Sequence, residues 1–178
     1  MICGLDISTS ITGVTILDEE GKMIFNDHWD FRKCKTFLEK VHLARQKIEG
    51  LLCSEDYELE HVFIEQSLQA FRPGFSSAKT ILTLAKFNGI LSWLVYDAFG
   101  IEPKYIGATT ARKVCGITVP RGQKAKSVVM QYMLDHHSSW FEVEYTPAGN
   151  PKAHYFDRAD SFVVAQAGYS CITKNLKY

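Results

Sequence analysis

Four acidic residues stand out because of where they fall in the sequence: Asp6, Glu65, Asp157 and Asp160. Asp6 interrupts an apolar run near the start of the chain, and Glu65 closes a second apolar run. Asp157 and Asp160 are three apart, a spacing that places two side chains on one face of a helix. A carboxylate inside an apolar strand is costly unless it is paired or holds a metal ion.

If these acids converge on one space, they cannot all stay ionised without cations. Oxygen ligands suit Mg²⁺, or Mn²⁺ in its place. Two such ions bridged by carboxylates stabilise both the attacking water and the leaving oxygen of a phosphodiester displacement. The sequence therefore predicts a site with two ions per chain, in which the four acids are metal ligands and catalytic groups. Each acid also has a purely structural interpretation. For example, Asp157 could be a helix N-cap and Glu65 a surface acid.

The charges are unevenly distributed although the formal net charge is zero at pH 7. Residues 18–60 hold eleven acids, whereas residues 66–96 and 103–134 hold none. A basic face is the electrostatic footprint expected for a phosphate polymer, and a solvated helix face is the alternative. The candidate contacts to such a polymer in these acid-free stretches are Arg72, Lys79, Arg112, Lys113, Arg121 and Lys124.

The hydrophobic pattern predicts the elements that must position the acids. Three short strands joined by tight turns come first, with Asp6 near the centre of the first strand. Further strands are predicted over 61–66 and 103–107, and helices over 31–53 (capped by Asp30), 77–99, 109–114, 123–137 and 156–172. Hairpin-joined strands pair antiparallel, and strands reached through a helix add in parallel. We therefore expect a single α/β domain, 1–178, in which a mixed five-stranded sheet has helices on both faces and Asp6 lies beside Glu65.

Two further segments suggest binding surfaces. The loop after Glu65 carries Phe71 and Phe75, which either stack on an unpaired base or fix the loop to the core. The helix over 77–99 is apolar on most sides, and Ala85 and Gly89 would allow close approach of a second backbone. This pattern predicts a homodimer formed through that helix.

Several stretches in order resemble the RuvC-type Holliday junction resolvases of the RNase H-like superfamily. They are Gly4-Leu5-Asp6-Ile7-Ser8 with Thr12-Gly13-Val14, Ile64-Glu65-Gln66, residues 122–130, and Asp157-Arg158-Ala159-Asp160-Ser161, which is similar to the family's Asp-Ala-Ala-Asp-Ala. The resemblance implies an RNase H-like fold and a dimeric, Mg²⁺-dependent endonuclease for branched DNA such as a four-way junction. It also implies that the four acids are metal ligands and that Lys126 helps to hold the scissile phosphate. Leu68 stands where the family usually has an aromatic residue.

Two other functions remain open. The turn after Asp6 also resembles the phosphate loop of an actin-like phosphotransferase or ATPase, and a catalytically silent protein that binds branched DNA is the third candidate. The five cysteines form no CxxC pair, which argues against structural zinc and disulfides and favours a reducing compartment. With no apolar run of about 18 residues and no leader-like start, we expect a cytoplasmic protein of a bacterial cell or phage-infected host.

Overall fold

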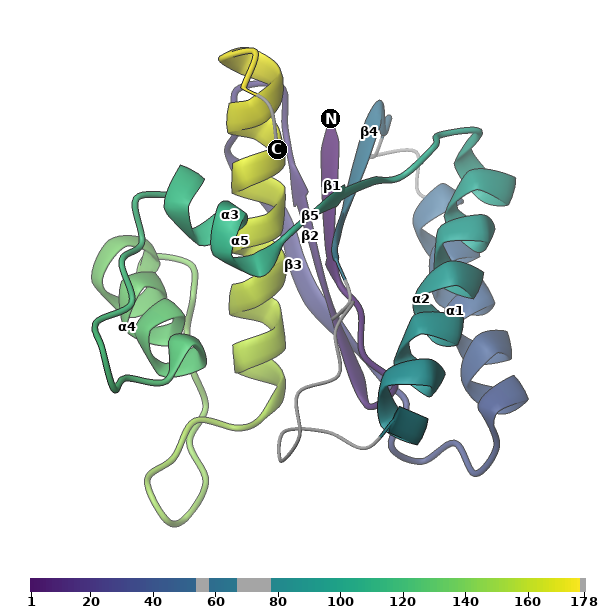
Figure 1. Ribbon diagram of the computed structural model, residues 1–178, viewed down its shortest axis with the longest axis horizontal. Coiled ribbons are helices and arrows are strands. Elements are labelled where there is room, and N and C mark those ends of the chain that lie inside the picture. The colour runs from purple at the N-terminus through teal and green to yellow at the C-terminus, as the bar shows by residue number, and fades with distance from the viewer. Residues whose placement is uncertain (54–57, 67–77, 177–178) are drawn as a thin grey trace.

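The computed structural model describes residues 1–53, 58–66 and 78–176. Five strands form one sheet in the order β3-β2-β1-β4-β5 (Figure 1). They are β1 (Ile2–Asp6), β2 (Ile11–Leu17), β3 (Met23–Asp30), β4 (His61–Glu65) and β5 (Lys104–Ile106). The first three strands pair antiparallel, and β4 and β5 add in parallel. The predicted mixed sheet is therefore confirmed, including the pairing of β1 with β4.

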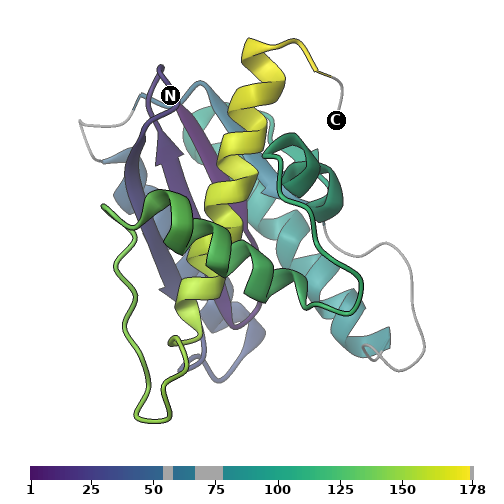
Figure 2. The same cartoon turned by 90° about the vertical axis from the view of Figure 1, so that its left-hand side faces the viewer.

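Helices cover both faces of the sheet, as predicted (Figure 1). The helices are α1 (Phe37–Leu52) and α2 (Ala78–Phe99) on one face, and α3 (Ala108–Val114), α4 (Ala125–His137) and α5 (His154–Thr173) on the other. Successive strand residues point to opposite faces, so Leu5 and Val14 pack under α1 and α2 while Ile2 and Leu17 pack under α5. Figure 2 shows α4 crossing α5 on the side away from the sheet.

Helix α5 lies against β1 and β2 with almost no clearance. A Cβ atom on Gly4 would fall 2.5 Å from the backbone nitrogen of Ala165. A Cβ atom on Gly13 would fall only 1.9 Å from the carbonyl oxygen of Asp157. These two glycines therefore allow a backbone contact that any larger residue would prevent. The contact at Gly13 sets how close the acid-bearing turn of α5 comes to the sheet.

Three differences from the sequence prediction concern the acids and the helix caps. Asp6 is the last residue of β1 and not its centre. Asp30 does not cap α1: it ends β3 and pairs with Arg32, while Thr36 caps the helix by accepting a hydrogen bond from the Glu39 amide.

The last helix also starts earlier than predicted. It begins at His154 after an N-cap at Ala153, so Asp157 lies within the first turn but is not the cap. Asp160 follows three residues later, in the second turn of the helix. Among the described residues, no helix is long and apolar enough to cross a membrane.

Candidate active site

Asp6 and Glu65 lie side by side because of the register between β1 and β4. Leu5 pairs with Ile64 in parallel orientation, and the two acids are the next residue on each strand. Parallel strands end at the same sheet edge, so both carboxyl groups reach the same side of the molecule. Asp6 is only 9% exposed.

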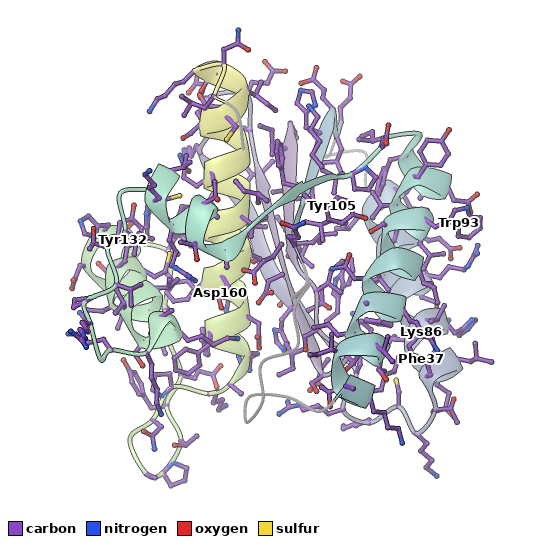
Figure 3. The ribbon with its side chains drawn as sticks, viewed as in Figure 1. Phe37, Lys86, Trp93, Tyr105, Tyr132 and Asp160 are labelled. Carbon is purple, nitrogen blue, oxygen red and sulfur yellow. The ribbon has the colours of Figure 1, made fainter. Side chains whose placement is uncertain are left out.

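Helix α5 brings the other two acids to the same place. Asp157 and Asp160 line one hollow of about 500 Å³ together with Asp6, Glu65 and Lys126. Figure 3 shows Asp160 on α5, and the hollow that it lines opens between this helix and the strand ends. Residues from β1, β4, α4 and α5 thus meet in a single cavity, although they are far apart in the sequence.

Lys126 forms an ion pair with both acids of α5. Its Nζ lies 2.9 Å from Asp157 Oδ1 and 3.4 Å from Asp160 Oδ2. The two carboxylate side chains are 13% and 12% exposed, whereas the lysine side chain is 56% exposed. The lysine therefore covers the acids from the solvent side and keeps its own charge partly hydrated.

Burial raises the pKa values of all four acids, and mutual repulsion raises some of them further. The pKa of Asp6 is raised well above its usual value, first by burial and then by the charges of Glu65 and Asp160. Burial and Asp160 raise the pKa of Glu65 to about 7. Burial also raises the pKa values of Asp157 and Asp160, although Lys126 opposes it. Such a group of acids favours protonation or a bound cation.

The charges of the acids stabilise the charged form of Lys126. Burial lowers the pKa of Lys126, but Asp6, Asp157 and Asp160 outweigh it and raise the pKa. Lys126 is therefore charged at neutral pH, and it stands where it partly neutralises the acids around it. Among the described residues, no three Asp, Glu, His or Cys side chains are already close enough to hold one ion. The donor set nevertheless fits a hard divalent cation, because every acid that lines the hollow offers carboxylate oxygens.

The predicted DNA-contacting residues lie at different distances from this hollow. Arg112 on α3 is close enough to lower the pKa values of Glu65 and Asp160 against the effect of burial. The other described candidates, Lys79, Lys113, Arg121 and Lys124, are exposed on the surface. Phe71, Arg72 and Phe75, and also Leu68, lie outside the described residues.

Several residues at the site carried no clear signal in the sequence. The segment that follows β5 contributes Gly107, Ala108 and Thr109 to the hollow, and Gln66 joins them. A parallel sheet brings this segment next to Glu65, which only the strand order reveals. His28 and Arg32 also lower the pKa of Asp157, in opposition to burial and after the larger effect of Lys126. They come from the stretch that the charge count marked as acidic.

The chain is similar to known proteins in sequence and in fold. No protein-family model matches the sequence. The crossover junction endodeoxyribonuclease RuvC of Aliarcobacter butzleri (strain RM4018) is 28% identical over 116 residues, which is 65% of this chain and 71% of the relative. The chain is similar to RuvC over this stretch. It has the resemblance that its motifs suggested, now in an independent match over most of its length.

Two solved structures share the RuvC-like fold. Thermus thermophilus RuvC in complex with a Holliday junction substrate superposes with a TM-score of 0.68 at 12% identity, covering 97% of this chain and 94% of that one. The yeast mitochondrial Holliday junction resolvase Ydc2 superposes with a TM-score of 0.59 at 14% identity, covering 95% and 77%. The RNase H-like fold class predicted from the sequence is therefore confirmed.

Proposed function

We propose that this protein is a metal-dependent endodeoxyribonuclease that nicks branched DNA, with the four-way junction as its substrate. The observation that carries the proposal is the single hollow lined by Asp6, Glu65, Asp157, Asp160 and Lys126 in a RuvC-like fold. The relatives are named for activity on crossover junctions, and one was solved with a Holliday junction substrate.

The acids would bind Mg²⁺, and Mn²⁺ would serve in its place. Two such ions, when bound, supply a Lewis acid and an activated water for phosphodiester hydrolysis. The raised pKa values mean that cation binding also removes protons and repulsion from the acids. The side chains of β1 and β4 are fixed by the sheet, so the acids on α5 define how wide the site is.

Lys126 would hold the scissile phosphate. Its side chain is half exposed and already contacts both acids of α5, so it can turn toward a phosphate oxygen once cations neutralise them. A lysine acts there as a compact positive charge and hydrogen-bond donor. Arg112, also close to Glu65, would meet the phosphate backbone next to the cut, while Lys113, Arg121 and Lys124 would bind farther along the DNA.

The protein would act as a homodimer assembled through α2. One side of this helix is exposed yet carries few charges. That exposed row comprises Leu82, Ala85, Lys86, Gly89, Trp93 and Tyr96. Figure 3 shows Trp93 and Lys86 on the outer side of α2, where they are exposed to solvent. Leu82, Trp93 and Tyr96 are each more than half exposed, at 61%, 53% and 55%, which is unusual for an apolar row unless a partner covers it. Two subunits related by symmetry would place two sites on one junction.

A cleavage panel tests the proposal. Four-way junctions, flaps and linear duplex are incubated with the protein in Mg²⁺ and then in Mn²⁺. We expect nicking of the branched substrates, and a loss of at least about 100-fold in the Asp6→Asn variant, because a ligand should matter more than its supporting groups. Junction binding by that variant should persist, since the basic residues are unchanged. Full cleavage by Asp6→Asn would contradict the proposal.

The same panel separates the alternatives. Junction binding without any cleavage in either metal would favour the catalytically silent DNA-binding protein. Binding of ATP in a calorimeter would favour the actin-like phosphotransferase. The location that fits the proposal is the cytoplasm of a bacterial cell or phage-infected host, and all five cysteines are free thiols in the structure.

A further inference from the structure

A closed cycle of hydrogen bonds connects α5 to β2 and β3. Asn26 Nδ2 donates to Thr15 Oγ1 at 2.7 Å and to the carbonyl oxygen of Arg158 at 3.0 Å. Thr15 Oγ1 lies 2.8 Å from Ser161 Oγ, and Ser161 Oγ donates to the same Arg158 carbonyl at 2.8 Å. Arg158 Nε returns a hydrogen bond of 2.9 Å to Asn26 Oδ1. We call these four residues the α5 latch.

The donors and acceptors of the α5 latch can be assigned without conflict. Ser161 gives its proton to the Arg158 carbonyl, so Thr15 must donate to Ser161. Thr15 in turn accepts from Asn26, whose amide nitrogen uses both of its protons and whose oxygen faces Arg158. Thr15 and Ser161 are fully buried. Removal of one member would leave another buried polar group without a partner, which is costly.

The latch and the acids share one turn of α5. Asp157 and Asp160 each stand directly before a latch residue, Arg158 and Ser161 respectively. The acids face the hollow, and the latch residues face β2 and β3. Arg158 is further held by the ring of Tyr155, 4.9 Å from the guanidinium carbon to the ring centre.

The backbone of β2 at Gly13 packs directly against the same turn of α5. A Cβ atom on Gly13 would fall 3.0 Å from Ser161 Cβ as well as 1.9 Å from the Asp157 carbonyl oxygen. The turn thus has a contact that stops it moving toward β2. The latch supplies the complementary restraint, because its hydrogen bonds stop the turn moving away.

Electrostatic repulsion between the acids favours outward movement of the α5 turn, and the latch opposes this movement. The strand acids and the helix acids line one hollow, so their like charges repel one another. Lys126 offsets only part of this repulsion. This repulsion pushes the acid-bearing turn away from β1 and β4. The α5 latch is uncharged at three of its four members and lies on the far side of the turn, so it resists the push without adding repulsion of its own.

We propose that Asn26 is a positioning residue for the metal site, and that the α5 latch holds Asp157 and Asp160 at the spacing from Asp6 and Glu65 that cation binding requires. This inference rests on the metal-binding part of the proposed function. It is separate from the resemblance to the resolvases, because that family has alanine at the positions of Arg158 and Ser161. The latch is therefore a feature of this chain.

Direct binding of Mn²⁺ tests the inference without any need for DNA cleavage. Calorimetric titration compares the wild-type protein with Asn26→Ala and Ser161→Ala, and thermal unfolding of each variant is followed alongside. We expect each variant to bind Mn²⁺ about 10- to 100-fold more weakly, the usual effect of removing a group that orients a ligand. The double variant should bind little more weakly than either single one, because the residues act as a unit.

Ser92→Ala is the matched control. Ser92 is also buried and donates to a helix carbonyl, that of Asn88 at 2.7 Å, but it lies on α2 across the sheet. Its loss should lower the unfolding temperature and leave Mn²⁺ binding unchanged. If Asn26→Ala and Ser161→Ala behave like this control, the latch has only a structural role and the inference is wrong.

The two proposals can fail separately. A wild-type protein that binds Mn²⁺ but cuts no branched DNA would contradict the proposed function, while the binding comparison would still decide the role of Asn26. A wild-type protein that binds no Mn²⁺ would overturn both. If Asn26→Ala does not fold, Ser161→Ala decides, because it removes a single hydroxyl group and matches the family's alanine.

Discussion

Lys126 reaches from α4 to α5 and places its ammonium group 2.9 Å from Asp157 Oδ1. This ion pair joins a half-exposed cation to a largely buried acid, so the acid depends on the lysine for its charge balance while no cation is bound. A divalent ion bound as proposed would compete with the lysine for the same carboxylate oxygens. Removal of Lys126 should therefore affect metal binding and DNA cleavage differently.

Replacing Lys126 with alanine should reduce the nicking rate by about 100-fold, the usual cost of losing one group that stabilises developing charge. Mn²⁺ binding should stay at least as tight, because a competing cation is gone. Single-turnover cleavage and calorimetry measure the two effects. Lys124→Ala is the control: Lys124 is exposed and forms no ion pair with the described residues. This variant should bind DNA more weakly, and the slope of log binding constant against log salt concentration should fall in magnitude by about one. The cleavage rate of bound DNA should be unchanged.

Without metal, the protein should lose stability as the pH rises from about 4.5 to about 7. The pKa of Glu65 is raised from 4.5 to about 7, mainly by burial and then by Asp160, so the folded state favours the protonated acid. Its stabilising contribution is present at low pH and is lost as the pH approaches the folded-state pKa. The slope for one such group is at most about 1.4 kcal/mol per pH unit.

Urea unfolding in a chelator at several pH values measures this slope. Glu65→Gln should reduce it, whereas Glu49→Gln, which changes an exposed acid on α1, should not. Added Mg²⁺ should reverse the trend, because the cation binds the ionised acids and stabilises the folded state more at higher pH. An identical slope in Glu65→Gln and the wild type would show that this acid is not the cause.

Gly89 offers a test of the dimer that leaves the folded subunit intact. A Cβ atom at Gly89 would meet nothing within 4 Å, and the same is true of Gly50 on α1. Gly89→Leu should therefore be tolerated within one subunit but should separate two packed α2 helices, increasing the dissociation constant at least about tenfold. Analytical ultracentrifugation measures it, and Gly50→Leu is the control. A dimer unaffected by Gly89→Leu would place the interface elsewhere.

Gly13 tests the close contact between α5 and β2. Gly13→Ala should destabilise the protein by about 1–3 kcal/mol, because the new methyl group collides with the Asp157 backbone. Gly4→Ala should cost a similar amount through Ala165, which lies on α5 more than one turn beyond Asp160. Only Gly13→Ala should also weaken Mn²⁺ binding. Equal Mn²⁺ binding by both variants would mean that the contact does not position the acids.

The sequence was sufficient for the sheet and for the meeting point of the acids. Strand order follows from connection length, so the pairing of β1 with β4 could be predicted, and with it the approach of Asp6 to Glu65. The functional roles of the four acids remain predictions. The helix boundaries were less accurate. Asp30 looked like a cap for α1, although Thr36 and Glu39 carried the better capping pattern.

Other features could not be read from local patterns. The α5 latch joins Asn26 to Arg158 across 132 positions, and neither residue type is unusual where it stands. The segment after β5 enters the hollow only because β5 pairs with β4. The electrostatic effect of Arg32 on Asp157 likewise depends on tertiary distance, since its neighbourhood in the sequence is acidic. Charge counts along a chain do not determine charge around a cavity.

The contact of Gly13 with α5 has a consequence for engineering. The helix that fills the core is also the helix that carries two of the four acids, and the glycine contact leaves it no room to slide. The metal preference proposed for this site would therefore be changed by exchanging individual side chains, but not by shifting the helix. The proposed DNA preference would be easier to alter through exposed lysines such as Lys113 and Lys124, because these side chains can change without displacing the core.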